Sequence, residues 1–282
     1  MKQAGALVGR TILMSGGSRG IGLAIALRAA ADGANVAMVA KSATAHPNLP
    51  GTIFTAAEEI EAAGGAALPI VGDVRNEGSI AAAVEQTVER FGGIDIVINN
   101  ASAIDLRNSQ ELPPKRYDLM QDINVRGSYL LTAAAVPQLR AAAQKNPGGA
   151  HVLTLSPPLN LKPHWFKDHT AYTMSKYGMS MTTIGFAAEL ADAGVGVNSL
   201  WPATLIDTAA IRNMPGGQEL VKRGRKPEIV ADAAWHILTS DGRQTSGNFF
   251  IDDQVLSEAG VTDFGDYAVE PGAELMVDAF LD

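Results

Sequence analysis

The stretch Ser15-Gly-Gly-Ser-Arg-Gly-Ile-Gly22 joins an apolar run, residues 10–15, to an amphipathic run, residues 21–31. The apolar run predicts a strand and the amphipathic run predicts a helix. Glycine lets the backbone turn tightly at such a junction and lets a phosphate approach without meeting a Cβ atom. The helix then presents free N–H groups and the positive end of its dipole to that phosphate. The stretch therefore predicts a phosphate-binding turn, and an ordinary strand-to-helix turn is the alternative.

The same alternation continues along the chain. Further strands are predicted at residues 35–40, 67–71, 94–98, 151–155 and 195–200. Helices are predicted over a stretch that ends with residues 58–63, and at residues 79–91, 115–143 and 171–191. Continuous apolar strands separated by helices indicate a parallel sheet covered on both faces, and right-handed crossovers make it doubly wound. Because no linker or repeat divides the chain, we expect one α/β domain of the Rossmann type over residues 1–282, with its core at about 8–252 and about seven strands.

The composition excludes several classes of function. The chain has 282 residues, a net charge of −8 and 46% hydrophobic residues, so a sizeable core is expected. Nucleic acid and anionic membrane surfaces are disfavoured as partners because both attract basic proteins. The absence of cysteine excludes disulfides, thiolate nucleophiles and cysteine–zinc sites. The five histidines lack a compact metal-ligand spacing and no apolar run approaches the ~18 residues of a membrane span, so we expect a cytoplasmic protein without metal.

The end of the second predicted strand bears on the choice of nicotinamide cofactor. A carboxylate at this point hydrogen-bonds the ribose of NAD(H) and repels the 2′-phosphate of NADP(H). Here the positions are Ala40 and Lys41, and Arg19 lies in the glycine turn on the same side. Two cations without a carboxylate favour NADP(H) over NAD(H), and the alternative is that both cations are solvated at the surface.

Two polar residues follow or end further predicted strands. Asp73 comes after the third strand, where it can accept a hydrogen bond from an adenine amino group or cap the next helix. Asn99 ends the fourth strand, and ligands of open α/β sheets bind beyond the carboxyl ends of the strands. We therefore expect Asn99 to lie near the cofactor, to hold neighbouring backbone together, or both.

Tyr172 and Lys176 stand at positions i and i+4 in Ala171-Tyr-Thr-Met-Ser-Lys-Tyr-Gly178, so they share one face of a predicted helix. Tyrosine, with a pKa near ~10, is a poor base at neutral pH, and a nearby ammonium is expected to lower that pKa. A lone pair of this spacing is commonly a surface pair. Combined with the glycine turn, it indicates the acid/base of a hydride-transfer enzyme.

With these motifs together, residues 8–252 resemble the classical short-chain dehydrogenase/reductase family. Within that family they are similar to the hydroxysteroid dehydrogenase-like protein 2 group. The segments that carry this similarity are Val39-Ala-Lys-Ser42, His46-Pro-Asn-Leu-Pro-Gly-Thr-Ile53, Ser156-Pro-Pro-Leu-Asn-Leu161 and Lys176-Tyr-Gly-Met-Ser-Met181. Longer members of the group have a sterol-carrier-like domain, for which this chain is expected to be too short.

The resemblance implies a role for each motif. Tyr172 is the proton donor or acceptor at the substrate oxygen, and Lys176 binds the nicotinamide ribose and lowers the tyrosine pKa. Asn124, in a kinked helix, helps to hold a water-linked proton relay. The implied contacts to NADP(H) are Gly16, Ser18, Arg19, Gly20, Ile21, Gly22, Lys41, Asp73, Asn99, Tyr172 and Lys176. Members commonly pair through the helices that hold Asn124 and Tyr172, so a homodimer or homotetramer is expected.

Three departures from the family pattern lie near the expected substrate. The catalytic serine is usually the second of a Ser-Ser pair, whereas the pair here is Ser156-Pro157 and stands further from Tyr172. Ser156 either polarises the substrate carbonyl or only caps the strand end. The family's Asn-Asn-Ala-Gly ends here in Ser102, a substitute hydroxyl. The usual Pro-Gly after the sixth strand is Pro202-Ala203, a turn that must form without positive φ.

Four segments have less definite roles. Residues 42–51 are expected to form a loop, residues 204–226 an irregular segment that serves as a mobile lid, and the acidic tail beyond Leu256 a surface or subunit contact. The residues His164, Trp165, Phe166 and His169 either line an apolar substrate pocket or pack against a neighbouring subunit.

The function predicted from these residues is an NADP(H)-dependent oxidoreductase that interconverts a secondary alcohol and a carbonyl. The apolar loop favours a lipid-like, acyl, terpenoid or steroid-like small molecule as substrate. The alternative is an NADP(H)-binding regulatory module with weak or no catalysis, which Pro157 supports and the intact Tyr172, Lys176 and Asn124 oppose. Enoyl reduction is disfavoured because the family's enoyl reductases space the Tyr–Lys pair more widely.

Overall fold

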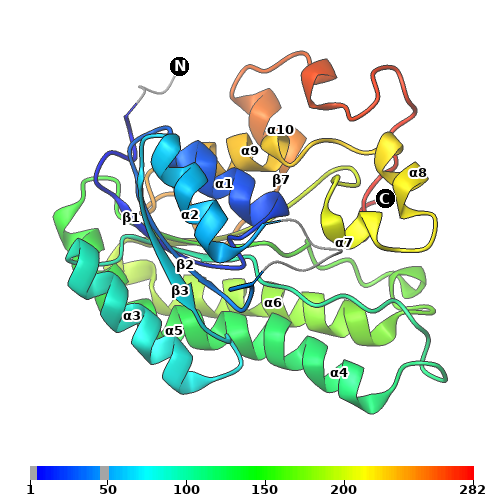
Figure 1. Ribbon diagram of the computed structural model, residues 1–282, viewed down its shortest axis with the longest axis horizontal. Coiled ribbons are helices and arrows are strands. Elements are labelled where there is room, and N and C mark those ends of the chain that lie inside the picture. The colour runs from blue at the N-terminus through cyan, green and yellow to red at the C-terminus, as the bar shows by residue number, and fades with distance from the viewer. Residues whose placement is uncertain (1–4, 45–50) are drawn as a thin grey trace.

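The computed structural model describes residues 5–44 and 51–282, and its centre is a parallel sheet of seven strands (Figure 1). The strands are β1 Thr11–Ser15, β2 Asn35–Ala40, β3 Ala66–Val71, β4 Ile96–Asn99, β5 Ala150–Thr154, β6 Val195–Trp201 and β7 Phe249–Ile251. Their order across the sheet is β3-β2-β1-β4-β5-β6-β7. In register, Ile12 of β1 lies between Val36 of β2 and Ile96 of β4. The predicted doubly wound Rossmann-type sheet is therefore confirmed.

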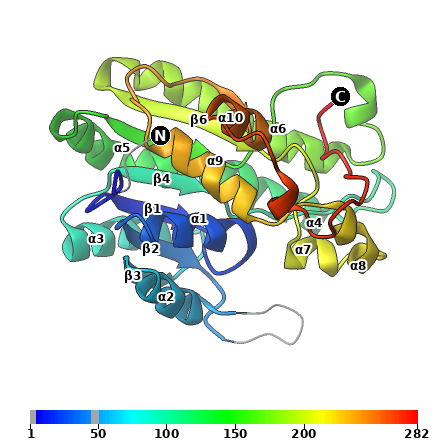
Figure 2. The ribbon, with the colours of Figure 1, turned by 90° about the horizontal axis from the view of Figure 1, so that it is seen from above.

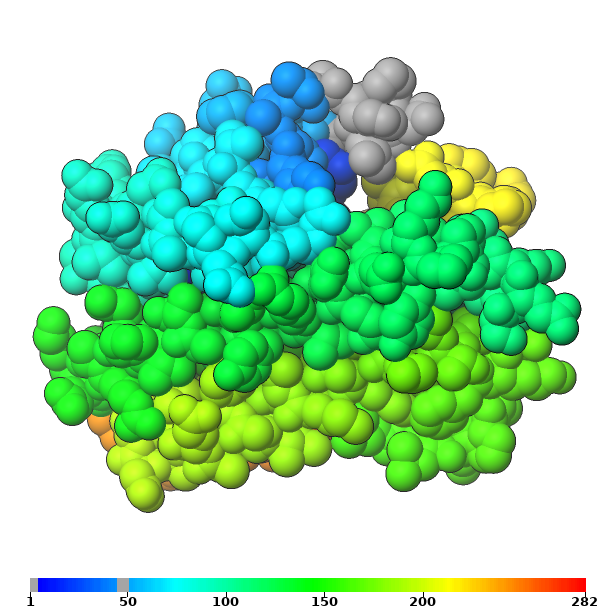
Figure 3. Space-filling model, turned by 90° about the horizontal axis from the view of Figure 1, so that it is seen from below, coloured from blue at the N-terminus to red at the C-terminus, as the bar shows by residue number. Residues whose placement is uncertain are grey.

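Helices cover both faces of this sheet. Their bounds are α1 Gly20–Ala30, α2 Ile53–Ala62, α3 Glu77–Phe91, α4 Pro114–Met120, α5 Gly127–Lys145, α6 Thr170–Glu189, α7 Ala209–Arg212, α8 Gly217–Leu220, α9 Glu228–Leu238 and α10 Asp252–Glu258. Helices α1, α2, α9 and α10 pack on one face, which Figure 2 shows from above. Helices α3, α5 and α6 pack on the other face and form the surface seen in Figure 3.

The apolar runs of the strands are explained by burial on both sides. Along β1, Ile12 and Met14 belong to the core beneath α1 and α9, whereas Leu13 belongs to the core beneath α3 and α5. All three side chains are fully buried. A strand with helices on both faces needs apolar residues at every position, and this need distinguishes it from the alternating pattern of a half-exposed strand.

The order of the strands determines where a crevice opens. The chain winds outward from β1 to β3 in one direction and from β4 to β7 in the other. The segments that follow β1 and β4 therefore diverge beyond Ser15 and Asn99. In open α/β sheets, ligands bind at such a switch point, outside the carboxyl ends of the strands.

Some predicted elements differ in the structure. The single helix predicted over 115–143 is divided into α4, a π-helical turn at Gln121–Arg126, and α5. The segment predicted as irregular at 204–226 contains α7, α8 and a 3₁₀ turn at Val221–Arg223. Neither β7 nor α9 was located from the sequence. Most of the predicted loop at 42–51 lies outside the described residues.

The end of the chain crosses the carboxyl ends of the strands. Residues 259–282 contain a 3₁₀ turn at Gly265–Tyr267, form a bridge between Val277 and Thr204, and end beside the loop that precedes α6 (Figure 2). The segment predicted to rest on the surface or on a neighbouring subunit thus buries Phe280 within its own chain. Within the described part of the chain, no helix has the length and apolar character needed to cross a membrane.

Candidate functional site

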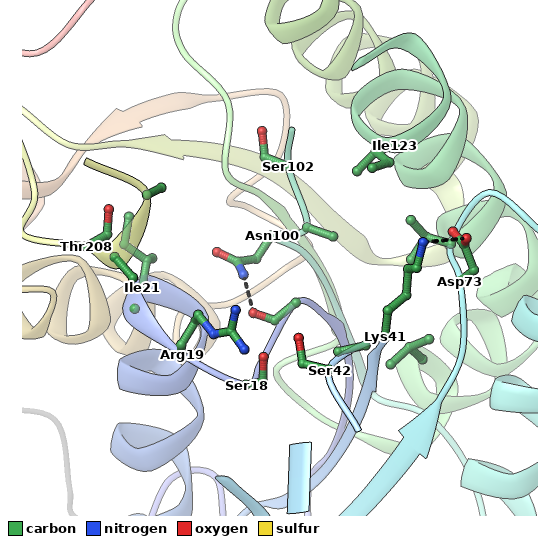
Figure 4. A pocket seen from close by; sticks show the side chains of 18 of the residues that line it. Ser18, Arg19, Ile21, Lys41, Ser42, Asp73, Asn100, Ser102, Ile123 and Thr208 are labelled. Atoms are coloured by element: carbon green, nitrogen blue, oxygen red, sulfur yellow. Dashed lines mark hydrogen bonds and ion pairs between the residues drawn. The ribbon is translucent and has the colours of Figure 1, made fainter. Parts of the chain in front are cut away.

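A cavity of about 400 Å³ opens at the switch point between β1 and β4 (Figure 4). The implied cofactor residues on its wall are Gly16, Ser18, Arg19, Gly20, Ile21, Lys41 and Asp73. Gly22, Asn99, Tyr172 and Lys176 are not part of that wall. Ser102 and Thr208 border the cavity from the segments after β4 and before α7. The structure therefore gathers the residues of the glycine turn and of the β2 end, and separates them from the tyrosine pair.

The glycine turn is shaped by positions that exclude a side chain. Gly16 and Gly20 have φ of 72° and 56°, which only glycine adopts without strain. A Cβ atom on Gly22 would overlap the carbonyl oxygen of Gly16 and the amide nitrogen of Asn100. The Asn100 side chain donates a 2.7 Å hydrogen bond to that carbonyl oxygen. The absence of a side chain at Gly22 thus permits the close packing that shapes the turn, although Gly22 does not line the cavity.

The start of α1 at the cavity suits an anion. Arg19 precedes the helix, no side chain caps its N–H groups, and no acidic residue lies in its first turn. The Nε atom of Arg19 is buried without a hydrogen-bond partner, and burial lowers the pKa of this guanidinium from its ordinary value. Free backbone donors, a helix dipole and an unpartnered guanidinium nitrogen together fit the phosphates of a dinucleotide.

Lys41 reaches the cavity from the end of β2 and pairs with Asp73, with 3.3 Å between Nζ and Oδ2 (Figure 4). Arg75 also donates to both oxygens of Asp73, at distances from 2.6 to 3.0 Å. The hydrogen bonds from Arg75, with smaller help from Lys41, hold the pKa of Asp73 below its ordinary value. The alternative of Asp73 as a helix cap is wrong, because Asn76 caps α3 by accepting a hydrogen bond from the Ser79 N–H.

The two asparagines after β4 have different positions. Asn99 is buried and donates to the hydroxyls of Thr132 and Thr154, at 2.9 and 3.2 Å. It therefore joins β4 to α5 and β5 through side-chain hydroxyls, and it does not lie on the cavity wall. Asn100 lines the cavity instead. Asn100 is the second Asn of Asn-Asn-Ala-Ser, and the sequence alone did not show which of the two asparagines faces the cavity.

Tyr172 and Lys176 lie on the inner face of α6, and both are nearly inaccessible, with 8% and 3% of their surface exposed. The Lys176 Nζ atom donates to the Leu155 carbonyl at 2.6 Å and lies 4.9 Å from the centroid of the Trp201 ring. Burial lowers the pKa of Lys176 to about 7, and the nearby charge of Asp278 opposes that change. The two predicted partners are thus present on one helix face, in a site closed to water.

The expected direction for the tyrosine pKa is wrong in this conformation. Burial, together with the negative charge of Asp278, raises the pKa of Tyr172 above its ordinary value. A buried phenolate would lack hydration, and a neighbouring carboxylate repels it. This effect could not be predicted from the sequence, because Asp278 lies more than a hundred positions from Tyr172 along the chain. The Tyr172 phenol is therefore harder to deprotonate here than a solvated tyrosine.

Asn124 occupies the π-helical turn between α4 and α5 and is fully buried. Its side chain accepts a 2.7 Å hydrogen bond from the N–H of Ala103 and donates to the carbonyl of the same residue at 2.9 Å. It also donates to the Ser175 hydroxyl on α6 at 2.9 Å. The segment after β4 is thereby fixed to the helix that holds Tyr172.

The hydroxyls expected to assist Tyr172 are differently placed. Ser156 is fully buried, and its hydroxyl shares a 2.9 Å hydrogen bond with Ser199, which is linked at 2.8 Å to Thr183. Its hydroxyl is therefore engaged in the core between β6 and α6. Ser102 is exposed on the cavity wall. Thr208, which the sequence analysis did not single out, lines the same cavity and caps α7.

An aromatic cluster surrounds Tyr172. The cluster consists of Trp165, Phe166, Tyr172, Tyr177, Trp201 and Phe280. Trp165 and Phe166, predicted to line a substrate pocket or to meet another subunit, contact the rings of Phe280 and Tyr177 respectively. The turn at Pro202-Ala203 forms without positive φ, and the Ala203 N–H donates to Asp252 at 2.8 Å.

Comparisons with known proteins identify the family. The family model described as short chain dehydrogenase matches residues 10–217. A hydroxysteroid dehydrogenase-like protein 2 of Danio rerio is 55% identical over all 282 residues, which span 66% of that relative's length. Solved structures of a putative dehydrogenase from Xanthomonas campestris and a short chain dehydrogenase from Mycobacterium thermoresistibile are 50% and 54% identical. Both superpose with a TM-score of 0.91 over 98% of this chain, and over 99% and 96% of their own chains. The chain therefore belongs to the short-chain dehydrogenase/reductase family of oxidoreductases, and it spans slightly less than two thirds of the curated relatives that it matches.

Proposed function

We propose that this chain interconverts a secondary alcohol and a carbonyl with NADP(H), and that Tyr172 is the acid/base. The observation that carries the proposal is the pairing of Tyr172 and Lys176 on one face of α6, fixed through Ser175 to Asn124. A protein that only bound a nucleotide would have no need for a buried lysine beside a buried tyrosine, because burial of a charge is costly.

Tyr172 gives its proton to the substrate oxygen during reduction and takes it back during oxidation. Bound NADP(H) supplies or accepts the hydride. Lys176, with a pKa near 7, is partly ammonium at neutral pH, and that charge stabilises the phenolate left by proton transfer. Asn124 keeps the tyrosine helix in register with the cavity through its three hydrogen bonds.

The preference for NADP(H) over NAD(H) rests on Arg19 and Lys41. Both cations line the cavity, and Asp73, the acid nearest to them, is already neutralised by Lys41 and Arg75. A 2′-phosphate in the cavity would meet the Arg19 side chain on the wall and a Lys41 ammonium whose side chain is 62% exposed. Because Asp73 is paired with two cations, it repels a 2′-phosphate less than an unpaired carboxylate would.

An apolar substrate is supported by the rings around Tyr172. Trp201, Tyr177 and Trp165 form a dry aromatic wall next to the proposed acid/base. Such walls bind flat rings and alkyl chains, with a few polar groups that set the orientation. We infer a lipid-like, acyl, terpenoid or steroid-like substrate class on this ground.

A homodimer or homotetramer is proposed from the surface of α5 and α6. Tyr129 on α5 and Met181 and Ile184 on α6 are about half exposed or more, at 53%, 61% and 48%. Figure 3 shows these two helices side by side on one open face. Large apolar side chains gathered on adjacent helices favour burial against a second copy of the chain.

One observation favours a second candidate, a regulatory NADP(H)-binding module. Tyr172 is covered, and the Ser156 hydroxyl is committed to Ser199. This candidate accounts for the cation-lined cavity but leaves the Tyr172–Lys176 pair without a purpose.

The test is a titration with NADPH and NADH, followed by fluorescence, and then a screen of carbonyl compounds with Tyr172→Phe as the control. We expect tighter binding of NADPH than of NADH, with the difference lost in Lys41→Ala and retained in Lys145→Ala, which removes an exposed lysine at the end of α5. Tyr172→Phe should bind NADPH normally and lose turnover by ~100-fold or more. NADPH binding without turnover of any compound would favour the regulatory module, and equal binding of both nucleotides would contradict the proposed cofactor.

A further inference from the structure

The last residues of the chain are docked as a strand beside the segment that follows β6. The N–H of Leu205 donates to the Met276 carbonyl at 2.9 Å, and the N–H of Asp278 donates to the Ala203 carbonyl at 3.1 Å. The indole of Trp201 donates to the Ala279 carbonyl at 2.9 Å. These bonds carry the chain end across the carboxyl edge of the sheet (Figure 2).

This docking buries the ring of Phe280 against the proposed acid/base. Phe280 is 1% exposed, and its ring centroid lies 6.2 Å from that of Tyr172, with the two planes inclined by 29°. The rings of Tyr177 and Trp201 lie 5.2 and 5.9 Å from it. Phe280 therefore fills an aromatic pocket that has Tyr172 as one wall.

The backbone at Phe280 is unfavourable for a bulky residue. Its φ is 74°, in the left-handed region that side chains other than those of Gly, Asn and Asp seldom adopt. Surrounding contacts must hold such a conformation, and strain of this kind is concentrated at ligand clamps and switch regions. The Phe280 ring is thus buried although its backbone conformation is unfavourable, so the contacts of the ring must hold the residue in place.

The docked tail closes the route that a substrate needs. A carbonyl oxygen has to come within hydrogen-bond distance of the Tyr172 hydroxyl to receive its proton. With Phe280 stacked on it, Tyr172 is only 8% exposed, and the cavity that holds Ser102 and Thr208 does not reach it. Substrate and the Phe280 ring therefore compete for the same space.

The contacts that hold residues 276–282 can be replaced by contacts with solvent or with another molecule. The terminal Asp282 pairs with Lys162 at 2.6 Å and with His164 at 3.5 Å, and all three side chains are about half exposed. Exposed ion pairs of this type contribute little to stability. The ring of Phe280 is the principal apolar anchor, and another apolar group of similar size can replace its contacts without leaving a void.

The carboxyl group of Asp278 makes the docked state of residues 276–282 less stable. The tail brings this carboxyl close to Tyr172, Lys176 and the buried Asp252, in surroundings from which water is largely excluded. Burial raises the pKa of Asp278 to about 7, which shows that its charge is poorly accommodated there. Release of the tail returns the carboxyl to water.

We propose that residues 276–282 are an internal ligand of the substrate subsite: Phe280 occupies the place of the substrate's apolar group, and a carbonyl compound with a flat apolar ring or chain binds by displacing it. The proposal rests on the proposed role of Tyr172 as acid/base. It makes the pocket formed by Trp201, Tyr177 and Trp165 the subsite for that apolar group, and it makes the chain end a competitor that every substrate meets.

The first test measures the affinity for 2-acetylnaphthalene, a neutral aromatic ketone, by calorimetry in the presence of NADP⁺, so that no turnover occurs. Only the molecules with a displaced tail bind, so the apparent dissociation constant equals the intrinsic one divided by the open fraction. Phe280→Ala should therefore bind the ketone about fivefold or more tightly than the wild type. Glu274→Ala, which changes an exposed side chain just before residues 276–282 and keeps the backbone bonds, should bind like the wild type.

Weaker or unchanged binding by Phe280→Ala would overturn the proposal, because a permanent wall residue loses contacts when it is truncated and a competitor does not. Failure of both proteins to bind the ketone would overturn it as well. Unchanged NADPH affinity and a cooperative unfolding transition check that Phe280→Ala is folded.

A second measurement is hydrogen exchange in the wild type with NADP⁺, with and without 2-acetylnaphthalene. Displacement of the tail breaks the bonds from the N–H groups of Leu205 and Asp278, so the ketone should speed exchange at both. Slower or unchanged exchange would contradict the proposal. Neither readout needs turnover, so an enzyme that reduces no ketone would refute the proposed function while these results still decided the role of the tail.

Discussion

The side chain of Asn124 donates a hydrogen bond to the hydroxyl of Ser175, with 2.9 Å between Nδ2 and Oγ. This bond joins the π-helical turn to α6 at Ser175, about one helical turn after Tyr172 and directly before Lys176. Asn124 also clamps the backbone of Ala103, so one buried amide holds the segment after β4 and the tyrosine helix together.

Asn124→Ala should lower both stability and kcat. It leaves the N–H and carbonyl of Ala103 without their partner, and buried groups left unpaired cost about 1–3 kcal/mol each. The Ser175 hydroxyl loses one bond and keeps its bond to the Tyr172 carbonyl. Denaturant unfolding and steady-state kinetics measure the two effects. Ser175→Ala, which removes one of the three bonds, should be milder in both. An Asn124→Ala protein as stable as the wild type would contradict the clamp.

Gly22→Ala should abolish the binding of NADPH and NADH alike. Its Cβ atom would overlap the Gly16 carbonyl and the Asn100 amide, so the glycine turn has to deform. Gly185→Ala is the matched control, because a Cβ atom there meets nothing within 4 Å on helix α6. That control should bind normally and gain about 0.5–1 kcal/mol of stability from the lower flexibility of the unfolded chain. Fluorescence titration and thermal unfolding check both, and normal affinity in Gly22→Ala would refute the role of the turn.

Ser102→Ala should reduce turnover more than Ser156→Ala does. Ser102 is exposed on the cavity wall, whereas the Ser156 hydroxyl is bonded to Ser199 inside the core. Loss of the Ser156 hydroxyl should instead cost stability, by about 1–3 kcal/mol, since Ser199 loses a buried partner. The two variants are compared by kcat/KM for one ketone and by denaturant midpoint. A large loss of kcat in Ser156→Ala with unchanged stability would show that Ser156 is catalytic after all.

The stability of the folded chain should fall as pH rises from about 4 to about 7, in part because of Asp278. Burial raises the pKa of Asp278 to about 7, and the charge of Asp252 adds to the rise while that of Lys176 opposes it. In this pH window the unfolded chain has released a proton that the folded chain keeps, so folding is favoured at the lower pH. Asp252, with a pKa raised to about 6, contributes to the same slope.

Asp278→Asn should flatten that slope, and calorimetric Tm values between pH 4.5 and 7.5 measure it. A change of ~1 kcal/mol corresponds to about 2–4 °C in a domain of this size. Asp282→Asn is the control, because the Lys162 pair lowers the pKa of Asp282 and its stabilising effect is lost only below this window. An equal slope in Asp278→Asn and the wild type would show that the carboxyl is not buried in solution.

The sequence predicted the sheet well because its signal is local. A strand such as β2 has to be apolar at every position when helices cover both faces, and the run Asn35–Ala40 shows this directly. The glycine turn is equally local, since Gly16, Gly20 and the start of α1 are neighbours in the chain. The short β7, with three residues at the edge of the sheet, carries too little pattern to be recognised.

The sequence also predicted the Tyr172–Lys176 pair but not its surroundings. Tyr172 and Lys176 share a helix face because positions i and i+4 of a helix lie one above the other. The direction of the tyrosine pKa depends instead on burial and on Asp278, which tertiary packing alone brings near. Tertiary packing also distinguishes Asn99 from Asn100. Asn99 is hydrogen-bonded inside the core, whereas its neighbour Asn100 lines the cavity.

The sequence by itself thus determined the doubly wound fold, the glycine turn between β1 and α1 and the tyrosine–lysine pair, because each follows from residues close together in the chain. Only the tertiary structure decided which hydroxyl faces the cavity, how Asp73 is paired, and that Phe280 packs against Tyr172. In the sequence, Phe280 is one more apolar residue in an acidic tail. Its position over Tyr172 arises from long-range hydrogen bonds with Ala203 and Leu205, which no local pattern encodes.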